Sequence, residues 1–234
     1  MQVEERAAAP DLSSLGPAER QALAALWARA ARSAAADVPA LAELVLALTA
    51  LGAPPELVAR AARSSAEQVA ASVACARMAS AYDGVRLVLD AQPALLGRTP
   101  LGVHRPRAAL RRLALRALRD GCLLGGHVAQ VACWASATST DPAARAALRV
   151  VAEGEASATS VWNDVLAWCL TQQPRLVVRL RRVELAEHSQ VARALAQAPG
   201  DPAVLAAHGW PRLAEVERLW SAHRAAVLAR VPVS

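Results

Sequence analysis

The stretch PELVARAARSSAEQVAASVACARMASAYDG, residues 55–84, decides the fold class, because its apolar and small side chains recur at alternating steps of four and three residues. This spacing is typical of a helix that presents one seam to neighbouring helices. Pro55 suits the first turn of such a helix, and Gly84 suits the residue after its end. The seam residues are Leu57, Ala61, Ser64, Gln68, Ala71, Cys75, Met78 and Tyr82. The stretch therefore predicts a long bundle helix over 55–83.

The same helical periodicity extends to both sides of this stretch, between Pro and Gly residues that mark the ends. The predicted helices cover 17–51, 106–139, 142–173 and 175–198, with a last one from 202 or 211 to 230. Almost no segment shows the alternation that is typical of a β-strand. The predicted fold class is therefore all-α.

The lengths of the connections indicate the topology. Residues 52–54 and 140–141 are short turns, so the helices on either side of each turn are expected to be antiparallel, whereas residues 84–105 are long enough to cross the bundle. Two hairpins joined by one crossover form a ferritin-like four-helix bundle. A helical solenoid is the alternative, but these helices are too long for the common repeats. The prediction is an N-terminal tail (1–16), a bundle (17–173) and C-terminal helices packed on it (174–234).

Composition limits the kind of core and the kind of partner. Hydrophobic residues make up 55% of the 234 residues, which excludes a disordered chain. Aromatic residues make up only 3%, with no Phe, so Ala, Leu and Val must fill the core. The net charge is +6 and every basic residue is Arg, but the acidic residues are interleaved with them. We therefore do not expect nucleic-acid binding, although a basic chain permits an anionic partner.

The sequence favours a cytoplasmic protein without a membrane span. The N-terminus has no basic region followed by an apolar one, so it does not resemble a secretory signal. The longest apolar run, 41–52, contains Glu43 and is too short to cross a bilayer. The cysteines lack metal-binding spacing and lie in helical segments, which fits a reduced compartment. They are Cys75, Cys122, Cys133 and Cys169.

Five stretches distributed over most of the chain carry a family resemblance. They are LALTALGAPPELV (46–58), ASAY (79–82), RDGC (119–122), TDPA (140–143) and LAW (166–168). At this spacing the chain resembles a ferritin-like-domain family of bacterial proteins of myxobacterial type. The resemblance implies a di-iron carboxylate bundle, in which two helices each supply a Glu and two helices each supply a Glu-x-x-His.

The positions at which the resemblance implies metal ligands carry side chains that cannot bind a metal strongly. These expected ligand positions are Ala34, Gln68, Ala71, Gly125, Gly154 and Ser157. A register shifted by one residue would place the last pair on Glu155 and Ala158, which also lacks a His. Buried carboxylates repel one another without a cation, so their loss stabilises a metal-free bundle. We therefore expect no metal, no cofactor and an interior of short neutral groups.

Four polar residues lie near the expected ligand positions: Asp37, Glu153, Glu155 and His127. One interpretation is a rearranged metal or proton site. The other, which we favour, is that Asp37 and Gln68 form a hydrogen bond while Glu153, Glu155 and His127 lean towards solvent. One His and scattered acids are a poor ligand set for a transition metal.

Three glycines, Gly121, Gly125 and Gly126, lie within six residues of the predicted helix 106–139. A Gly inside a helix costs about 1 kcal/mol relative to Ala, so the cluster needs a structural reason. Close approach of a neighbouring helix, a break in the helix and a small cavity all provide one.

The start of the same helix carries a cluster of basic residues: Arg105, Arg111, Arg112, Arg116 and Arg119. Clustered Arg can bind phosphate or the carboxylates of a partner. A solvated helix face is the interpretation that we favour.

Together these patterns predict a non-catalytic, metal-free interaction or scaffold protein, or an accessory subunit. Its expected partner is a second copy or a related ferritin-like subunit. One alternative is an oxidoreductase with a displaced metal centre at Asp37, Glu153, Glu155 and His127. The other is a small-molecule or lipid binder that uses the bundle core around the expected ligand positions.

Overall fold

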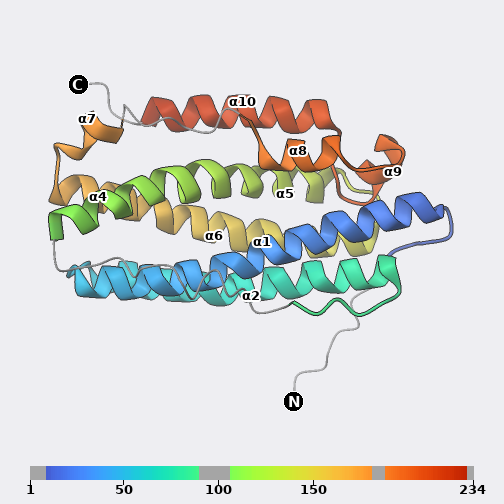
Figure 1. The fold of residues 1–234 in the computed structure, drawn as a ribbon, viewed down its shortest axis with the longest axis horizontal. Helices are drawn as coiled ribbons and strands as arrows, with labels where there is room; N and C mark the ends of the chain where they lie inside the picture. The colour runs from blue at the N-terminus through green and yellow to red at the C-terminus, as the bar shows by residue number, and fades with distance from the viewer. Residues whose placement is uncertain (1–8, 90–105, 181–187, 231–234) are drawn as a thin grey trace, which may run out of the picture.

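The computed structural model describes residues 9–89, 106–180 and 188–230 (Figure 1). Within these ranges the chain forms helices joined by turns, and no described residue lies in a β-strand. The predicted all-α class is therefore confirmed.

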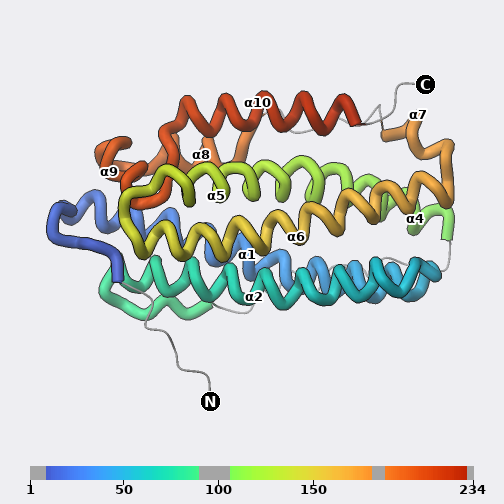
Figure 2. The backbone as a smooth tube through the Cα atoms, turned by 180° about the vertical axis from the view of Figure 1, so that it is seen from behind, coloured from blue at the N-terminus to red at the C-terminus, as the bar shows by residue number. Residues whose placement is uncertain are grey.

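Four long rods form the body of the molecule. They are α1 (Pro17–Ala50), α2 (Pro55–Asp83), a composite third rod, and α6 (Pro142–Gln172). The third rod consists of α4 (Pro106–Arg116), a π-helical segment η1 (Ala117–Gly125) and α5 (Gly126–Thr138). Figure 2 shows the four rods side by side from behind. The single helix expected over 106–139 thus contains a π-helical segment.

The rods pack unevenly around the bundle. Helix α1 lies along α2, α2 lies against α6, and α6 lies against the third rod. Between α1 and the third rod the described backbones make little contact. Figure 1 shows α2 ending at the opposite end of the bundle from the start of α4, so these two rods run in the same direction.

The rods begin where the sequence predicts, because Pro occupies the first turn of α1, α2 and α6. At the start of α6, Asp141 Oδ1 accepts a hydrogen bond from the Ala144 amide at 2.7 Å, which satisfies a free donor of the first turn. Helix α2 ends at Gly84, whose φ of 74° is readily adopted only by glycine.

Within the described part of residues 173–230, four shorter helices follow the bundle: α7 (Leu176–Leu180), α8 (Gln190–Ala196), α9 (Pro202–Ala207) and α10 (Leu213–Arg230). Helix α10 lies against α5, η1 and α8. One continuous helix over 175–198 is wrong, because Ser189 has a non-helical ψ of 132° and caps α8 through the Ala192 amide at 3.1 Å. Part of that predicted helix, 181–187, lies outside the described residues.

The segment 9–16 of the predicted N-terminal tail packs on the bundle, while residues 1–8 lie outside the described residues. Leu15 is buried in the core. The Asp11 amide donates a hydrogen bond to Asp141 Oδ2 at 3.0 Å. The acid that caps α6 therefore also holds the N-terminal segment.

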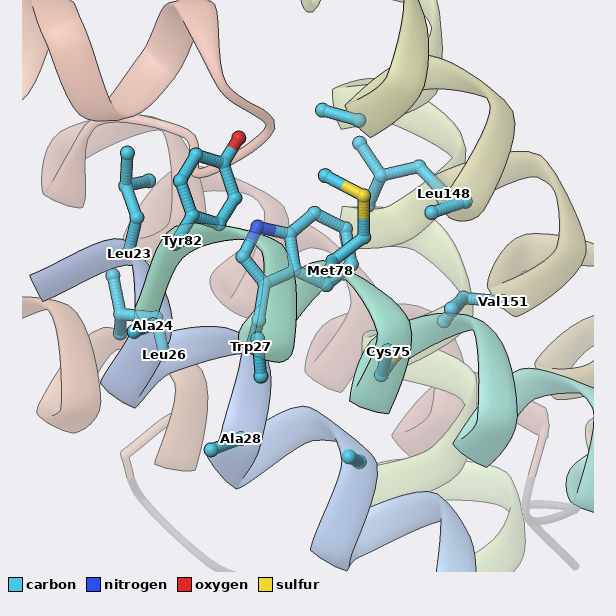
Figure 3. Close-up of a cluster of buried hydrophobic side chains, with 14 of the residues drawn as sticks. Leu23, Ala24, Leu26, Trp27, Ala28, Cys75, Met78, Tyr82, Leu148 and Val151 are labelled. Atoms are coloured by element: carbon cyan, nitrogen blue, oxygen red, sulfur yellow. The ribbon is translucent and has the colours of Figure 1, made fainter. Parts of the chain in front are cut away.

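Two apolar cores fill the bundle, one towards each end. In the first, Trp27 packs with Met78, Tyr82 and Leu148 (Figure 3). The second contains buried leucines of α1, α2 and the third rod, namely Leu41, Leu44, Leu48, Leu57, Leu113, Leu118 and Leu123. The segments of α1, α2, η1–α5 and α6 between these cores carry Asp37, Gln68, Gly125 and Glu155. The fold therefore places a polar layer midway along the bundle.

Of the described helices, α1 alone is long and apolar enough to cross a bilayer by length and composition. The core helix of a soluble protein and a signal sequence meet the same criterion. The absence of a membrane span and the cytoplasmic location therefore stay predictions.

Candidate functional site

A cavity of about 450 Å³ lies at the level of the polar layer, between α1 and the third rod. We call it the central cavity. Its charged and amide walls come from four rods: Asp37, Gln68, Arg116, Asp120 and Glu155. Short side chains and glycines of α1 and η1, among them Ala36 and Gly125, leave the space open.

A smaller apolar pocket of about 130 Å³ adjoins the central cavity. The pocket and the central cavity are neighbours, because they share four lining residues: Ser33, Val128, Glu155 and Gln190. Apart from the exposed Arg29, the remaining wall is apolar and includes Leu26, Trp27, Ala34, Val131, Leu148, Val151 and Trp210. Ser33 and Gln190 are exposed, so the junction reaches solvent between α1 and α8.

Glu155 is the most deeply buried acid of the central cavity, with only 6% of its surface exposed. Burial and, to a smaller extent, the nearby Asp37 carboxyl raise its pKa to about 8, against the opposing effect of Gln68. Asp37 behaves similarly, because burial and the charge of Asp120 raise its pKa to about 6 against the opposing charge of Arg116. Neither acid forms an ion pair with a described residue.

Gln68 has no exposed surface, and neither its Oε1 nor its Nε2 atom has a hydrogen-bond partner among the described residues. It lies close enough to Glu155 to lower the pKa of that carboxyl, but without hydrogen-bond geometry. The Oγ1 atom of Thr159, which also lines the cavity, is likewise buried and unpartnered. Buried polar groups without partners are costly, so the wall carries unused hydrogen-bonding capacity.

Among the described residues, Arg116 is the one basic residue on the wall of the central cavity. Its Nη1 atom lies 3.0 Å from Glu43 Oε2, and its Nε atom lies 4.0 Å from Asp120 Oδ2. The guanidinium also stands over the Trp162 ring, 5.7 Å from the ring centre. These contacts hold the guanidinium at Glu43 and Asp120, and its charge partly opposes the raised pKa of Asp37.

Gly121 and Gly125 are small for different structural reasons. A Cβ atom on Gly121 would clash with the Trp162 side chain, so Gly121 permits close approach of α6. A Cβ atom on Gly125 would meet no atom closer than 3.4 Å, so Gly125 leaves space in the cavity. Close contact, which the sequence left as one alternative, therefore applies to Gly121, and the cavity applies to Gly125.

The six expected ligand positions do not form one site. Gln68 and Gly125 line the central cavity, and Ala34 lines the apolar pocket. The other three lie where α2 meets α6: Gly154 packs against Ala71 and the Glu67 backbone, and Ser157 shares a hydrogen bond of 2.8 Å with Ser64. The residue of α6 that faces the cavity is Glu155, which belongs to the shifted register.

The arrangement that we favoured for the four polar residues is wrong on three points. Gln68 makes no hydrogen bond with Asp37, and Glu155 is buried rather than turned to solvent. His127 is also buried, but against α8 and α10 rather than in the cavity: its Nε2 atom is hydrogen-bonded to Ser189 Oγ at 2.8 Å, and its ring meets Trp220 edge-on. Only Glu153 is exposed as expected. The interior is therefore not built of neutral groups alone.

The arginine cluster is divided by the structure. Arg111, Arg112 and Arg119 are exposed, whereas Arg116 is turned inward to Glu43. Arg105 lies outside the described residues. The described arginines therefore do not form one surface patch, because Arg116 lines the cavity.

Among the residues of the cavity wall that sequence reasoning missed are Asp120 and Thr159. Asp120 is the acid of the RDGC stretch and carries no spacing signal of its own. Thr159 lies one turn after Glu155 in α6, so it could have been found once Glu155 was assigned to the inner face.

Among the described residues, no group of three or more His, Cys, Asp or Glu side chains is placed to hold a metal ion. Cys75, Cys122 and Cys169 are buried, and burial raises the pKa of each thiol. The structure thus gathers acids and an amide around an open space without assembling a compact ligand set.

Comparisons with known protein families, with curated proteins and with solved structures found no match for this chain. The ferritin-like resemblance therefore rests on the sequence stretches alone.

Proposed function

We propose that this protein is a non-catalytic helical bundle that binds a small organic molecule in the central cavity. The observation that carries the proposal is Gln68, a buried amide without hydrogen-bond partners on the wall of a cavity of about 450 Å³. Pockets for small molecules are usually of this order of volume and combine apolar walls with a few polar groups. A bound molecule would supply the partners that Gln68 and Thr159 lack.

We further propose that the bundle is a degenerate ferritin-like one. The common direction of α2 and α4, with two flanking hairpins, supports this assignment. The five sequence stretches support it independently. The expected ligand positions lie in the middle of the rods, at the level where the polar layer and the cavity are found.

The other two functions are less well supported by the geometry. An oxidoreductase with a displaced metal centre would need Asp37, Glu153, Glu155 and His127 together, but Glu153 is exposed and His127 faces α10. A scaffold or accessory-subunit role, with a second copy or a related subunit as partner, stays a prediction.

A matched pair of variants tests the binding function. Ala36→Leu adds a side chain to the wall of the central cavity, whereas Ala25→Leu adds the same side chain to an exposed site of the same helix. Three probes of similar size serve as ligands: 4-phenylbutylamine, 4-phenylbutanol and 4-phenylbutanoate. Calorimetry should detect binding of at least one probe with a stoichiometry near one in the wild type and in Ala25→Leu.

Ala36→Leu should lose that binding while its circular dichroism spectrum remains helical. If none of the three probes binds and mass spectrometry of the purified protein finds no retained organic molecule, the proposed function is wrong. Equal binding to both leucine variants would place the site elsewhere and would also contradict it.

A further inference from the structure

The chemistry of the cavity wall narrows the class of ligand, provided that the proposed binding function holds. Three carboxyl groups line the central cavity, those of Asp37, Asp120 and Glu155, against the single guanidinium of Arg116. Arg116 is itself shared between Glu43 and Asp120. Its charge only partly offsets the burial of Asp37, and no basic side chain of the described wall forms an ion pair with Asp37 or Glu155.

The three acids affect one another's ionisation. The charge of Asp120 disfavours the ionised form of Asp37, and the charge of Asp37 disfavours the ionised form of Glu155. A positive group placed between Asp37 and Glu155 would reverse both effects, because an opposite charge at short range favours ionisation. An anionic ligand would add to the repulsion instead.

Gln68 is a second observation that points to a ligand, since its unpartnered amide adds to the charges of the acids. Its Oε1 atom is an acceptor without a donor, at a position with no exposed surface. A primary ammonium group carries three N–H donors and no acceptor. The carboxyls of Asp37 and Glu155 together with Gln68 Oε1 offer acceptors from three different side chains.

The shape of the site argues for an organic cation rather than a bare ion. The central cavity is far larger than an ion, and no described set of His, Cys, Asp or Glu side chains gathers closely enough to hold a metal. Glu155 lines both the central cavity and the apolar pocket, whose wall includes Trp27 and Trp210. A ligand with its charge at Glu155 thus has an apolar surface within reach.

We propose that the ligand is an organic cation with an apolar body: its ammonium or amidinium group lies between Asp37, Glu155 and Gln68, and its apolar part extends towards Trp27 and Trp210. The acids recognise the charge, and the pocket recognises the hydrocarbon. Discrimination against neutral analogues comes from Asp37 and Glu155, because a cation favours the ionised form of both carboxyls and is attracted by it, whereas a neutral analogue is not.

The three probes named above test the charge preference directly. In the wild type at pH 7, calorimetry should show that 4-phenylbutylamine binds about tenfold or more tightly than 4-phenylbutanol, because a hydrogen bond to a charged group is worth more than a neutral one. Binding of 4-phenylbutanoate should be the weakest. If the three affinities are equal, or if the acid binds best, the cation proposal is overturned while the binding function stands.

Substitutions of the two acids test which side chains cause the preference for the amine over the alcohol. Glu155→Gln and Asp37→Asn should each reduce the advantage of the amine over the alcohol and leave the affinity for the alcohol nearly unchanged. Glu153→Gln, an exposed change two residues away on the same helix, is the matched control and should keep the full advantage. If neither cavity variant reduces the advantage, the assignment of the charge to these acids is wrong.

A metal titration tests whether a metal ion, rather than an organic cation, binds in the central cavity. Addition of Mn²⁺ or Fe²⁺ alone should not displace 4-phenylbutylamine and should not bind with a stoichiometry near one. Tight stoichiometric binding of either ion that depends on Glu155 would overturn the organic-cation proposal. Failure of all three organic probes, together with the absence of a retained organic molecule in the purified protein, would instead count against the binding function itself.

Discussion

His223 of α10 is bonded to the π-helical segment of the third rod. Its Nε2 atom lies 2.9 Å from the carbonyl oxygen of Cys122 and 3.1 Å from that of Leu123, so its N–H donates to this pair. A Cβ atom on Gly126 would lie 2.7 Å from the His223 ring, so the glycine allows the ring to approach. A π-helical segment is uncommon and is frequent at functional sites, and here it borders the central cavity.

Replacement of His223 should therefore loosen both α10 and the π-helical segment. His223→Ala removes a buried donor from two carbonyl groups, and we expect a loss of about 1–3 kcal/mol in the free energy of unfolding. His188→Ala, at an exposed position, should change it little. Urea unfolding followed by circular dichroism measures both, and equal values for the two variants would contradict the role given to His223.

Substitution of two glycines four residues apart should have opposite effects. Gly121→Ala forces a Cβ atom into Trp162 and should destabilise the protein by about 1–3 kcal/mol, the usual cost of overpacking. Gly125→Ala meets only ordinary contacts and should be neutral or stabilising by up to about 1 kcal/mol, because Ala is the better helix former. Urea midpoints at constant slope test this, and destabilisation by both changes would refute the assigned cavity.

Glu155 should make the unliganded protein less stable as the pH rises. Its pKa is about 8 in the folded protein and 4.5 in the reference state, so the folded state binds more protons between these values. Its contribution is therefore fully present below pH 4.5 and is lost as the pH rises through 8. The groups that affect it are Asp37 of α1 and Gln68 of α2, and Glu155 in turn raises the pKa of Cys75 of α2.

Glu155→Gln should consequently stabilise the protein at pH 8.5 and have little effect near pH 5. The upper limit is about 1.4 kcal/mol for each unit of pKa difference. Glu153→Gln should show no such pH dependence. Urea unfolding at the two pH values decides the matter, and a Glu155→Gln effect that does not change with pH would rule out the buried acid as its source.

His127 should make the protein less stable as the pH falls, whereas Glu155 does so as the pH rises. Burial and the nearby His223 lower its pKa from 6.5 to about 4. A base with a lowered pKa contributes stability that is present above pH 6.5 and is lost as the pH falls through 4. His127→Leu should remove this loss between pH 6.5 and 4, at the cost of the hydrogen bond to Ser189. Urea unfolding of Glu155→Gln and of the double variant Glu155→Gln/His127→Leu measures this loss. If both variants lose stability equally steeply between pH 6.5 and 4, the role given to His127 is contradicted.

The inward position of Arg116 also has a measurable consequence. Arg116→Gln breaks the partly buried pair with Glu43 and the contact with Trp162, and should cost about 1 kcal/mol. Arg111→Gln, at an exposed position of α4, should cost much less. Urea unfolding measures the free energy of unfolding of both variants. An equal loss in Arg111→Gln and Arg116→Gln would refute the structural role of Arg116.

The rods were predictable because their signals are local. All eight seam residues of 55–84 are buried, and the proline and aspartate starts of α1, α2 and α6 lie where the sequence placed them. The break at Ser189 was missed because a capping serine is also common on exposed helix faces. The π-helical segment was missed because its wider hydrogen-bond spacing leaves no distinct pattern of apolar residues.

The candidate site could be predicted only in part. Two adjacent seams of 142–173 fit the helical period equally well, one through Gly154 and one through Glu155, and a shift of one residue decides whether an acid faces the interior. The burial of Asp37 and the open space beside Gly125 depend on the distance between α1 and the third rod. That distance is a property of packing between segments far apart in the chain, which no local spacing encodes.

Because the backbones of α1 and the third rod make little contact, these two rods are joined mainly through side chains, in the second apolar core and in the pair of Glu43 with Arg116. The separation of the two backbones is what leaves room for the central cavity. The size of the cavity is therefore set by the lengths of the side chains along this contact rather than by the paths of the helices.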